Sequence, residues 1–337
     1  MAEKTAIQWA DSTLNPWMGC AKISPACDHC YAERFGKRMG IEWGPNAQRR
    51  RTSASTWRQP LRWNRKAEIA FHAWEKFKTS YIGLTDADLE EQGFVKPRRP
   101  RVFCGSLCDV FDNAVPMEWR ADLFKLIEDT PHLCWLLLTK RVGNVRDMAP
   151  VSWLGGPIQH GPDPSNIHGG WPENVWLGAT ICNQEEADRD IPKLLSVPAA
   201  KRFLSIEPCL GAIDLASQQI MIGDGRPFFN PLTGIEERSG MARNERISWV
   251  ICGGETGPRA RPMNPSWVRS LRDQCQAAGV PFFFKQWGEW HPNCLCDTKE
   301  PHPTTPRPEP GEPGVMFRCG KEAGRLLDNR LWDEVPA

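Results

Sequence analysis

Three cysteines near the N-terminus are the residues of this chain best suited to chemistry. Cys20, Cys27 and Cys30 lie in one short segment with the spacing C-x6-C-x2-C. Two thiolates three positions apart, with a third a short loop away, can converge on one metal centre. Three protein ligands leave one coordination position open, and an open position is where a metal does chemistry rather than hold a fold. We therefore expect the active site at this segment.

The composition bounds the class of protein. The chain has 337 residues, 40% of them apolar, which is enough for a large core in one α/β domain or two smaller ones. The net charge of +1 provides no global field for nucleic acid or membranes, so any such signal must be local. No apolar run is long enough to span a bilayer, and residues 1–8 lack a signal-peptide core. Because thirteen cysteines without a secretory signal indicate reduced thiols or metal chemistry, we expect a cytoplasmic protein.

Short apolar runs alternate with helical patterns along the chain. Nearly continuous hydrophobicity is typical of strands covered on both faces of a parallel sheet. The expected strands are 101–105, 134–140, 175–180, 202–207, 249–254 and 280–285, with one more before the cysteines. Helices are expected over 31–39, around 119–127, and from Pro265, which Asn264 can cap. The alternation predicts an α/β fold, a (β/α) barrel that is partial, with about six to seven parallel strands; a doubly wound open sheet is the alternative.

The remaining segments interrupt or follow this repeat. We expect residues 1–290 to form the barrel and residues 41–100 to form a helical insertion within it. Residues 291–313 are rich in proline and are expected to be a linker. Residues 314–337 have the pattern of a small β-hairpin, which we expect to pack back on the barrel.

Polar side chains follow several of the expected strands, where barrel enzymes place their chemistry. Lys140, Arg141 and Glu207 each come directly after an apolar strand. Solubility does not readily explain a carboxylate directly after an apolar strand, so we favour a functional role for Glu207. For Lys140 and Arg141, ion pairs or caps at the rim remain an equal alternative to a ligand role.

A Gly-Gly-Glu run follows a later strand. Gly253 and Gly254 would let the backbone approach a ligand closely. Glu255 could hold an ammonium group or ribose hydroxyls, and Arg259 or Arg261 a carboxylate or phosphate.

Several motifs taken together resemble a known family. They are N-P-W-x-G-C-x-K-x-S-x-x-C-x-x-C-Y-A-E, L-T-K-R, S-I-E-P, C-G-G-E-T-G-P-R-A-R-P and F-K-Q-W-G. They resemble a phage-associated three-cysteine family of uncharacterised proteins from phages and bacteria, over most of residues 5–290 and the terminal hairpin. That family is in turn similar to radical S-adenosylmethionine (SAM) enzymes of the spore photoproduct lyase type, which have a partial TIM-like barrel and three cysteines on a [4Fe-4S] cluster.

The resemblance implies a radical-SAM-like iron–sulfur enzyme. The three cysteines would bind the cluster through three irons, and SAM on the fourth iron would be cleaved to a 5′-deoxyadenosyl radical that acts on an unknown substrate, nucleic acid being one candidate. An electron donor is implied, and a partner protein is left open. The residues we assign to the cofactor are Gly253, Gly254, Glu255 and Arg259, and those we assign to the substrate are Lys140, Arg141 and Glu207.

Zinc is the alternative to a cluster. A structural zinc site completed by His29 or another cysteine would make the protein a zinc-stabilised nucleic-acid-binding module without catalysis, and ordinary thiols are the third reading. Basic residues interleaved with Trp57 and Trp63 could neutralise phosphates and stack bases; they include Arg49, Arg50, Arg51, Arg58 and Arg62. The competing interpretation is a solvated face balanced by nearby acidic residues.

Overall fold

The computed structural model describes residues 5–81, 83–155, 170–217, 229–236, 240–242, 244–292 and 316–336. The expected linker therefore lies outside the described residues from position 293 onward, as do Cys294 and Cys296.

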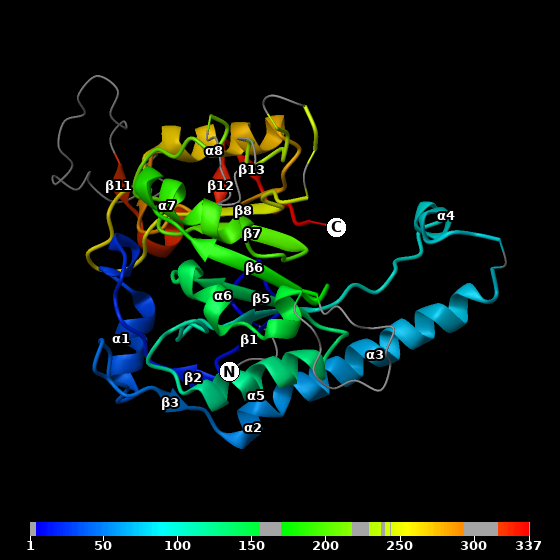
Figure 1. Ribbon diagram of the computed structural model, residues 1–337. Coiled ribbons are helices and arrows are strands. Elements are labelled where there is room, and N and C mark those ends of the chain that lie inside the picture. The colour runs from blue at the N-terminus through cyan, green and yellow to red at the C-terminus, as the bar shows by residue number, and fades with distance from the viewer. Residues whose placement is uncertain are drawn as a thin grey trace.

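Seven parallel strands form one curled sheet with the shape of a half-barrel (Figure 1). The strands are β1 (Ser12–Leu14), β4 (Arg101–Cys104), β5 (Cys134–Thr139), β6 (Val175–Thr180), β7 (Lys201–Ile206), β8 (Trp249–Gly253) and β9 (Phe282–Gln286). They lie side by side in the order β1-β4-β5-β6-β7-β8-β9, which is their order along the chain. A doubly wound sheet would reverse its order at a switch point. The partial-barrel prediction is confirmed, and the doubly wound alternative is wrong.

Helices follow most of these strands and cover one face of the sheet. The helices are α1 (Tyr31–Arg38), α2 (Ala54–Trp57), α3 (Gln59–Lys78), α4 (Asp86–Glu91), α5 (Met117–Glu128), α6 (Val145–Met148), α7 (Gln184–Leu195) and α8 (Pro265–Ala277). The start of α8 is as predicted, because the Asn264 side chain accepts a hydrogen bond from the backbone N–H of Ser266 with Pro265 in the first turn. Short 3-10 turns lie at Pro25–Cys27, Val142–Asn144, Val151–Leu154 and Gly320–Ala323.

The two faces of the sheet have separate apolar cores. On the outer face, alternate strand residues such as Leu137 and Val250 pack in one cluster with Leu123 of α5, Ile191 of α7 and Leu271 of α8. The inner-face cluster takes its members from the strands and from the N-terminal segment. They are Trp9, Ala10, Phe103, Cys134, Leu136, Trp176, Phe203, Trp249, Ile251 and Phe283. Because side chains alternate along a strand, these members mark which later residues face inward.

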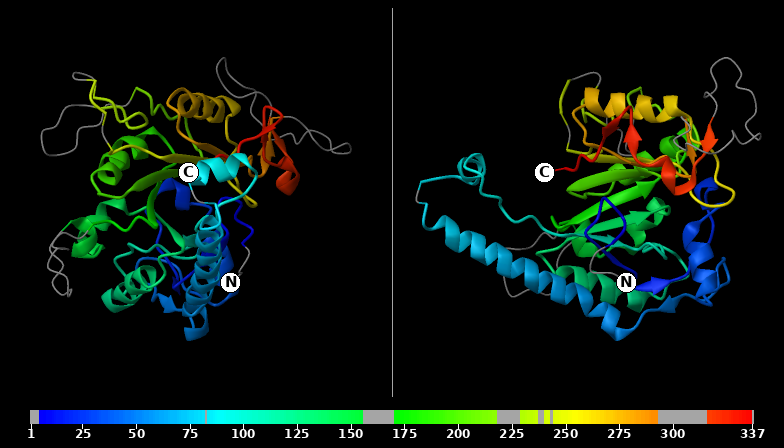
Figure 2. Two further views of the ribbon diagram at one scale, coloured as in Figure 1. Left: turned by 90° about the vertical axis from the view of Figure 1, so that its right-hand side faces the viewer. Right: turned by 180° about the vertical axis from the view of Figure 1, so that it is seen from behind.

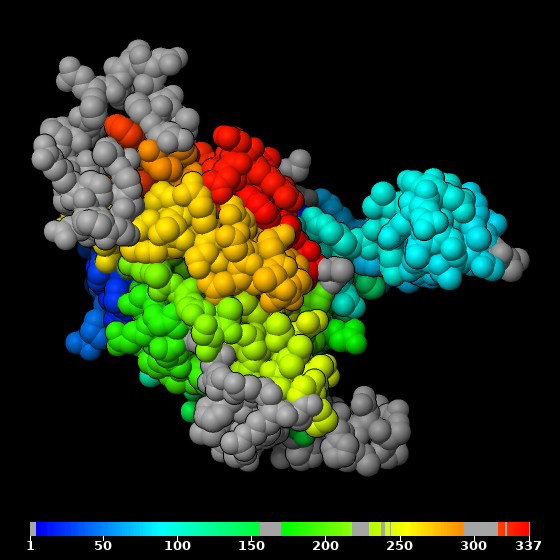
Figure 3. Space-filling model, turned by 90° about the horizontal axis from the view of Figure 1, so that it is seen from above, coloured from blue at the N-terminus to red at the C-terminus, as the bar shows by residue number. Residues whose placement is uncertain are grey.

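The insertion between β1 and β4 forms an arm. It contains the two-stranded pair of β2 (Trp17–Met18) with β3 (Arg50–Arg51), followed by α2, α3 and α4. The first half of α3 packs on the body through Trp63, whereas its far half and α4 extend well beyond the sheet (Figures 2 and 3). Residues 41–100 thus contain β3 and the helices α2, α3 and α4.

The C-terminal segment covers the β9 edge of the sheet. β12 (Leu326–Leu327) pairs antiparallel with β13 (Arg330–Leu331), which is the expected hairpin, and β10 (Trp290–His291) pairs with β11 (Phe317–Arg318). Phe284 N–H donates to the carbonyl of Trp332, and Phe283 bridges to Asp333. Within the described part of the chain, no helix is both long and apolar enough to cross a membrane.

Candidate functional site

The three cysteines lie on a loop at the carboxyl edge of the half-barrel. We call residues 19–30 the cysteine loop. Residues that follow three different strands contact it or the helix start directly after it: Ser106 after β4 accepts from the Tyr31 hydroxyl at 3.0 Å, Arg141 after β5 contacts Cys20, and Glu255 after β8 contacts His29. The loop therefore lies where parallel strands of a barrel present their functional groups.

Local sequence shapes the loop. Gly19 has φ of +108°, and a side chain there would also approach Arg49 Cδ at 3.2 Å, so glycine is required at this turn. Ser24 caps the short turn Pro25–Cys27 by accepting from the Ala26 N–H. Cys27 is buried and Cys30 is partly exposed.

The cysteines share the loop, but their thiols do not converge. Within the described ranges, no three histidine, cysteine or acidic side chains are grouped closely enough to hold a metal ion. The Cys20 sulfur contacts the Arg141 guanidinium instead, at 3.4 Å. Burial, assisted by Asp109, raises the pKa of Cys20 to about 11, against the opposing effect of Arg141.

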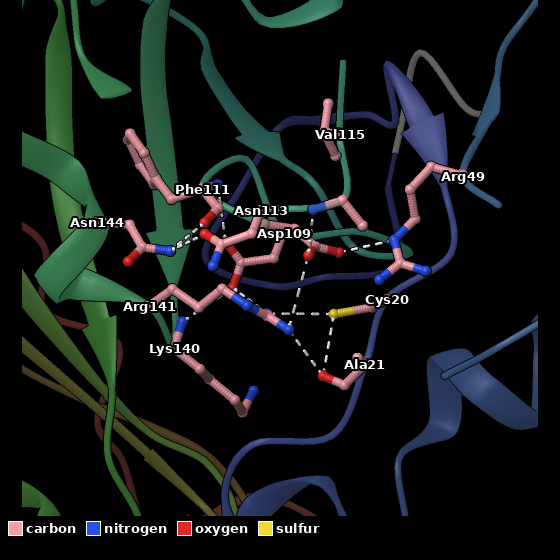
Figure 4. A network of polar contacts seen from close by, with 12 residues as sticks. Cys20, Ala21, Arg49, Asp109, Phe111, Asn113, Val115, Lys140, Arg141 and Asn144 are labelled. Carbon is pink, nitrogen blue, oxygen red and sulfur yellow. Dashed lines mark hydrogen bonds and ion pairs between the residues drawn. The ribbon is translucent and has the colours of Figure 1, made fainter. Parts of the chain in front are cut away.

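Arg141 is the centre of a buried polar network (Figure 4). Its Nη1 donates to Cys20 Sγ and, at 3.3 Å, to Asp109 Oδ2, while its Nη2 donates to the carbonyl of Ala21 at 2.9 Å. Asp109 in turn accepts from the Thr139 hydroxyl at 2.7 Å and from the Lys140 N–H at 3.1 Å. Arg141 is thus directed at the cysteine loop. The Lys140 ammonium makes no hydrogen bond or ion pair with any described residue.

A second arginine holds the other end of the loop. Arg261 donates twice to the carboxylate of Glu255, at 2.9 and 2.6 Å, and its Nη1 and Nη2 reach Asp28 at 3.0 Å and the Pro25 carbonyl at 2.9 Å. His29 Nδ1 lies 3.1 Å from the same carboxylate. Burial raises the pKa of Glu255, but the hydrogen bonds from Arg261 and His29 outweigh it, and the net pKa is lowered. The Glu255 oxygens are therefore already engaged within the protein. Arg259 is exposed and has no such partner in the described structure.

The two glycines before Glu255 have different surroundings. A Cβ on Gly254 would lie 1.9 Å from the Trp287 carbonyl oxygen, so close backbone packing explains this glycine without a ligand. A Cβ on Gly253 would lie 3.1 Å from Glu207 Oε1 and 3.4 Å from Lys285 Cβ. Gly253 follows Ile251 of the inner-face cluster by two positions, so it opens onto the inner face.

An ion pair lies on that inner face beside Gly253. Lys285 Nζ is 2.7 Å from Glu207 Oε1, and the Ser205 hydroxyl donates to Glu207 Oε2 at 3.0 Å. Tyr31 is 49% exposed, and its hydroxyl donates to the Ser106 carbonyl. Burial raises the pKa of Tyr31, and the charges of Cys30 and Glu207 act in the same direction.

The predicted nucleic-acid residues divide into two groups. Arg49 is buried and paired with Asp112 at 2.7 Å, and Arg51 pairs with Asp122 at 2.6 Å and stacks on Trp57. These arginines are used within the fold. The other three, Arg50, Arg58 and Arg62, are exposed and have no ion-pair partner within the described structure.

Sequence reasoning missed Tyr31 and Asp112 and placed Arg141 with the substrate groups. The signal for Tyr31 was its position directly after the third cysteine. Asp112 gave no local signal, because its partner Arg49 is distant in the sequence.

The fold and site define a class: parallel half-barrel proteins with a three-cysteine loop at the carboxyl edge of the sheet. This chain belongs to the family described as "Protein of unknown function (DUF5131)", which matches residues 4–336. No curated protein and no solved structure matches the chain. Its function is therefore argued from the site.

Proposed function

We propose that this protein is a radical-SAM-like iron–sulfur enzyme whose [4Fe-4S] cluster is held by Cys20, Cys27 and Cys30. The observation that carries the proposal is the position of the cysteine loop at the carboxyl edge of a parallel half-barrel. Hydrogen bonds from Arg141 hold one end of this loop, and hydrogen bonds from Arg261 hold the other. A reactive centre there would face the inner side of the sheet, where the Lys285–Glu207 ion pair lies.

The three cysteine thiols are chemically suitable ligands for such a cluster. Three cysteine sulfurs and no fourth protein ligand are what an open cluster requires. Because the three thiols do not converge as they stand, Cys20 would have to turn from Arg141 toward the other two thiols before the cluster could bind. When bound, the cluster would chelate SAM at its free iron and supply the electron that cleaves it, an external donor having delivered that electron.

The chain's own residues would bind and orient the reactants. Exposed Arg259 would pair with a carboxylate or phosphate of the cofactor. The space beside Gly253 is taken by Glu207 and Lys285, so the cofactor would reach Gly253 only where these two side chains move aside. Glu207, with Lys285, would hold polar groups of the substrate. Lys140, which follows β5, would contribute its ammonium from another strand end. Glu255 would act indirectly, by fixing the loop through Arg261 and His29, in place of the direct contact with SAM that we expected.

A zinc-stabilised module is the weaker candidate. His29 or another cysteine was expected as the fourth zinc ligand, and His29 lies against Glu255. This placement favours a three-thiol site over a Cys3His zinc site.

Nucleic acid remains a proposed substrate or partner. The exposed arginines Arg50, Arg58 and Arg62 lie on β3 and around the α2–α3 junction, and they support phosphate contacts there. Because a cluster on thiolates needs reduced cysteines, the proposal also places the protein in the reducing cytoplasm.

Anaerobic reconstitution with iron and sulfide tests the proposal. We expect a brown protein with about four irons per chain in the wild type. Loss of the cluster is expected in Cys20→Ala, Cys27→Ala and Cys30→Ala. Cys319→Ser, in the C-terminal segment, is the matched control and should retain it. Stoichiometric zinc with no iron would contradict the proposal.

Turnover is tested separately. Reduced, reconstituted protein incubated with SAM should release 5′-deoxyadenosine, which chromatography detects. Its repeated absence with a fully loaded and reduced cluster would leave an electron-transfer or structural cluster as the better interpretation.

A further inference from the structure

A large cavity lies at the amino edge of the half-barrel, opposite to the cysteine loop. It has a volume of about 1170 Å³ and is lined by the segments that lead into β7, β8 and β9, by Arg146 of α6 and by Pro336 near the C-terminus. Figure 1 shows the C-terminus and α1 on different sides of the sheet. Pockets that hold small organic ligands measure roughly 300–1,000 Å³, so this amino-edge cavity has room for a ligand larger than a single inorganic anion.

The charged residues around the amino-edge cavity are mostly basic. Its described lining includes four basic side chains, those of Arg146, Lys201, Arg202 and Arg246, and one carboxylate, that of Glu245. None of the three arginines forms an ion pair with a described residue. The described lining therefore carries a net positive charge.

Arg202 is the buried member of this group. It is 4% exposed, and its Nε and Nη2 donate to the carbonyl of Val197 at 3.0 and 2.5 Å, while its Nη1 donates to the carbonyl of Asn244 at 3.3 Å. Burial lowers the pKa of Arg202 to about 10, against the opposing effect of Glu245. The two carbonyls orient the guanidinium but do not neutralise it. Because buried charges in proteins are normally paired, an anion in the cavity would supply the partner that Arg202 lacks.

The other two arginines have donors to spare. Arg146 uses Nη1 to hold the carbonyl of Ser196 at 2.9 Å, and the guanidinium of exposed Arg246 makes no hydrogen bond or ion pair with any described residue. Val197 and Val280 add apolar surface to the same cavity. Guanidinium groups bind phosphate through paired N–H donors, and an apolar wall beside them suits the remainder of an organic phosphate.

We propose that the amino-edge cavity binds a small phosphate-bearing ligand of nucleotide size, with its phosphates against Arg146, Arg202 and Arg246. The site is separate from the cysteine loop, and the inference does not depend on the proposed function. The competing explanation is that Arg202 only ties together the segments before β7 and β8. Arg246 separates the two, because it contacts the ligand in the first case and holds nothing in the second.

The test is isothermal titration calorimetry of the full-length protein with ATP, pyrophosphate and adenosine, at physiological ionic strength and without divalent cations. We expect ATP to bind, pyrophosphate to compete with it, and adenosine not to bind. Arg246→Gln and Arg146→Gln should each weaken ATP binding about tenfold, since each removes a charged hydrogen-bond donor. Arg246→Gln should keep wild-type stability in urea unfolding. The matched control is Arg38→Gln, an exposed arginine of α1 without an ion pair in the described structure, which should bind ATP as the wild type does.

Four outcomes would overturn the inference. The first is a wild-type protein that binds neither ATP nor pyrophosphate. The second is adenosine that binds as tightly as ATP, or pyrophosphate that does not compete, because the phosphates would then not be what the site recognises. The third is wild-type affinity for ATP in both Arg146→Gln and Arg246→Gln. The fourth is an equal loss in Arg38→Gln, which would make the effect one of overall charge.

Discussion

Gly254 and Trp287 are in direct backbone contact, at a distance that admits no side chain on the glycine. A Cβ at position 254 would meet the Trp287 carbonyl oxygen at 1.9 Å and its carbonyl carbon at 2.6 Å. The strand end that leads to Glu255 is thereby fixed against the segment that follows β9. The same close packing recurs at Gly288, where an added Cβ would lie 2.2 Å from the Glu255 carbonyl oxygen.

Alanine substitutions at the neighbouring glycines 253 and 254 should therefore destabilise the protein by different amounts. Gly254→Ala forces the backbone apart and should lower the free energy of unfolding by about 3 kcal/mol or more. A Cβ at position 253 meets side-chain atoms of Glu207 and Lys285 first, and the backbone oxygen of Gln286 only at an ordinary contact distance of 3.6 Å. Gly253→Ala should therefore cost about 1 kcal/mol or less, while it narrows the inner face beside Glu207. Urea unfolding measures both. Equal losses in the two variants would contradict the assignment of Gly254 to packing.

Arg49 should prove structural although it belongs to the basic stretch. Arg49→Gln removes the nearer ion-pair partner of the buried carboxylate of Asp112 and leaves only Arg141 at 3.9 Å, and loss of one partner of a buried pair costs about 3–5 kcal/mol. The exposed neighbour Arg50 is the matched control, and Arg50→Gln should change stability by less than about 0.5 kcal/mol. Thermal or urea unfolding of the two variants decides the matter: similar stabilities would show that the Arg49–Asp112 pair contributes nothing.

If the exposed arginines bind nucleic acid, the salt dependence of the binding constant should fall with each arginine that is removed. Replacing both Arg58 and Arg62 with glutamine should reduce the slope of log K against log salt for duplex DNA by about 1.8, since each phosphate contact contributes about 0.9. Fluorescence anisotropy across a salt series measures the slope. Arg330→Gln, a distant exposed arginine of the C-terminal hairpin, should leave the slope unchanged. No salt-dependent binding at low ionic strength would remove nucleic acid from the proposal.

The Glu255–Arg261 pair should make stability depend on pH. The pKa of Glu255 is lower in the folded protein than its ordinary value of 4.5, so its stabilisation is complete above that value and is lost as the pH falls through the folded pKa. Glu255→Gln should therefore be less stable than the wild type by about 2 kcal/mol at pH 7, and the difference should shrink toward pH 3. Chemical unfolding at several pH values measures it.

The control for this experiment is Glu118→Gln. Glu118 is exposed and has no ion pair within the described structure, so its replacement should change stability by less than about 0.5 kcal/mol at pH 7. A Glu255→Gln difference that stayed constant from pH 7 to pH 3 would show that the ionised carboxylate is not what stabilises the loop.

The sequence by itself determined the elements and the location of the chemistry. Continuous apolar runs predicted six of the seven parallel strands, because strands covered on both faces need apolar side chains in both directions. The seventh, β1, was expected only as a strand somewhere before the cysteines. Asn264 and Pro265 predicted the start of α8, because a helix cap is formed by residues next to each other in the chain. The cysteine spacing and the rim residues indicated where to look for a site, since each is a short-range pattern.

Only the tertiary structure decided what those residues do. Cys20 and Arg141 are 121 positions apart, and His29 and Glu255 are 226 apart. No periodicity or spacing encodes such pairs, because they form only when the curled sheet brings distant strand ends to one edge. The same is true of Gly254, whose need for glycine comes from the backbone of Trp287, and of Trp9, which fills the inner face from the N-terminal segment. Local physics fixes the elements, and contacts between distant segments fix the role of each side chain.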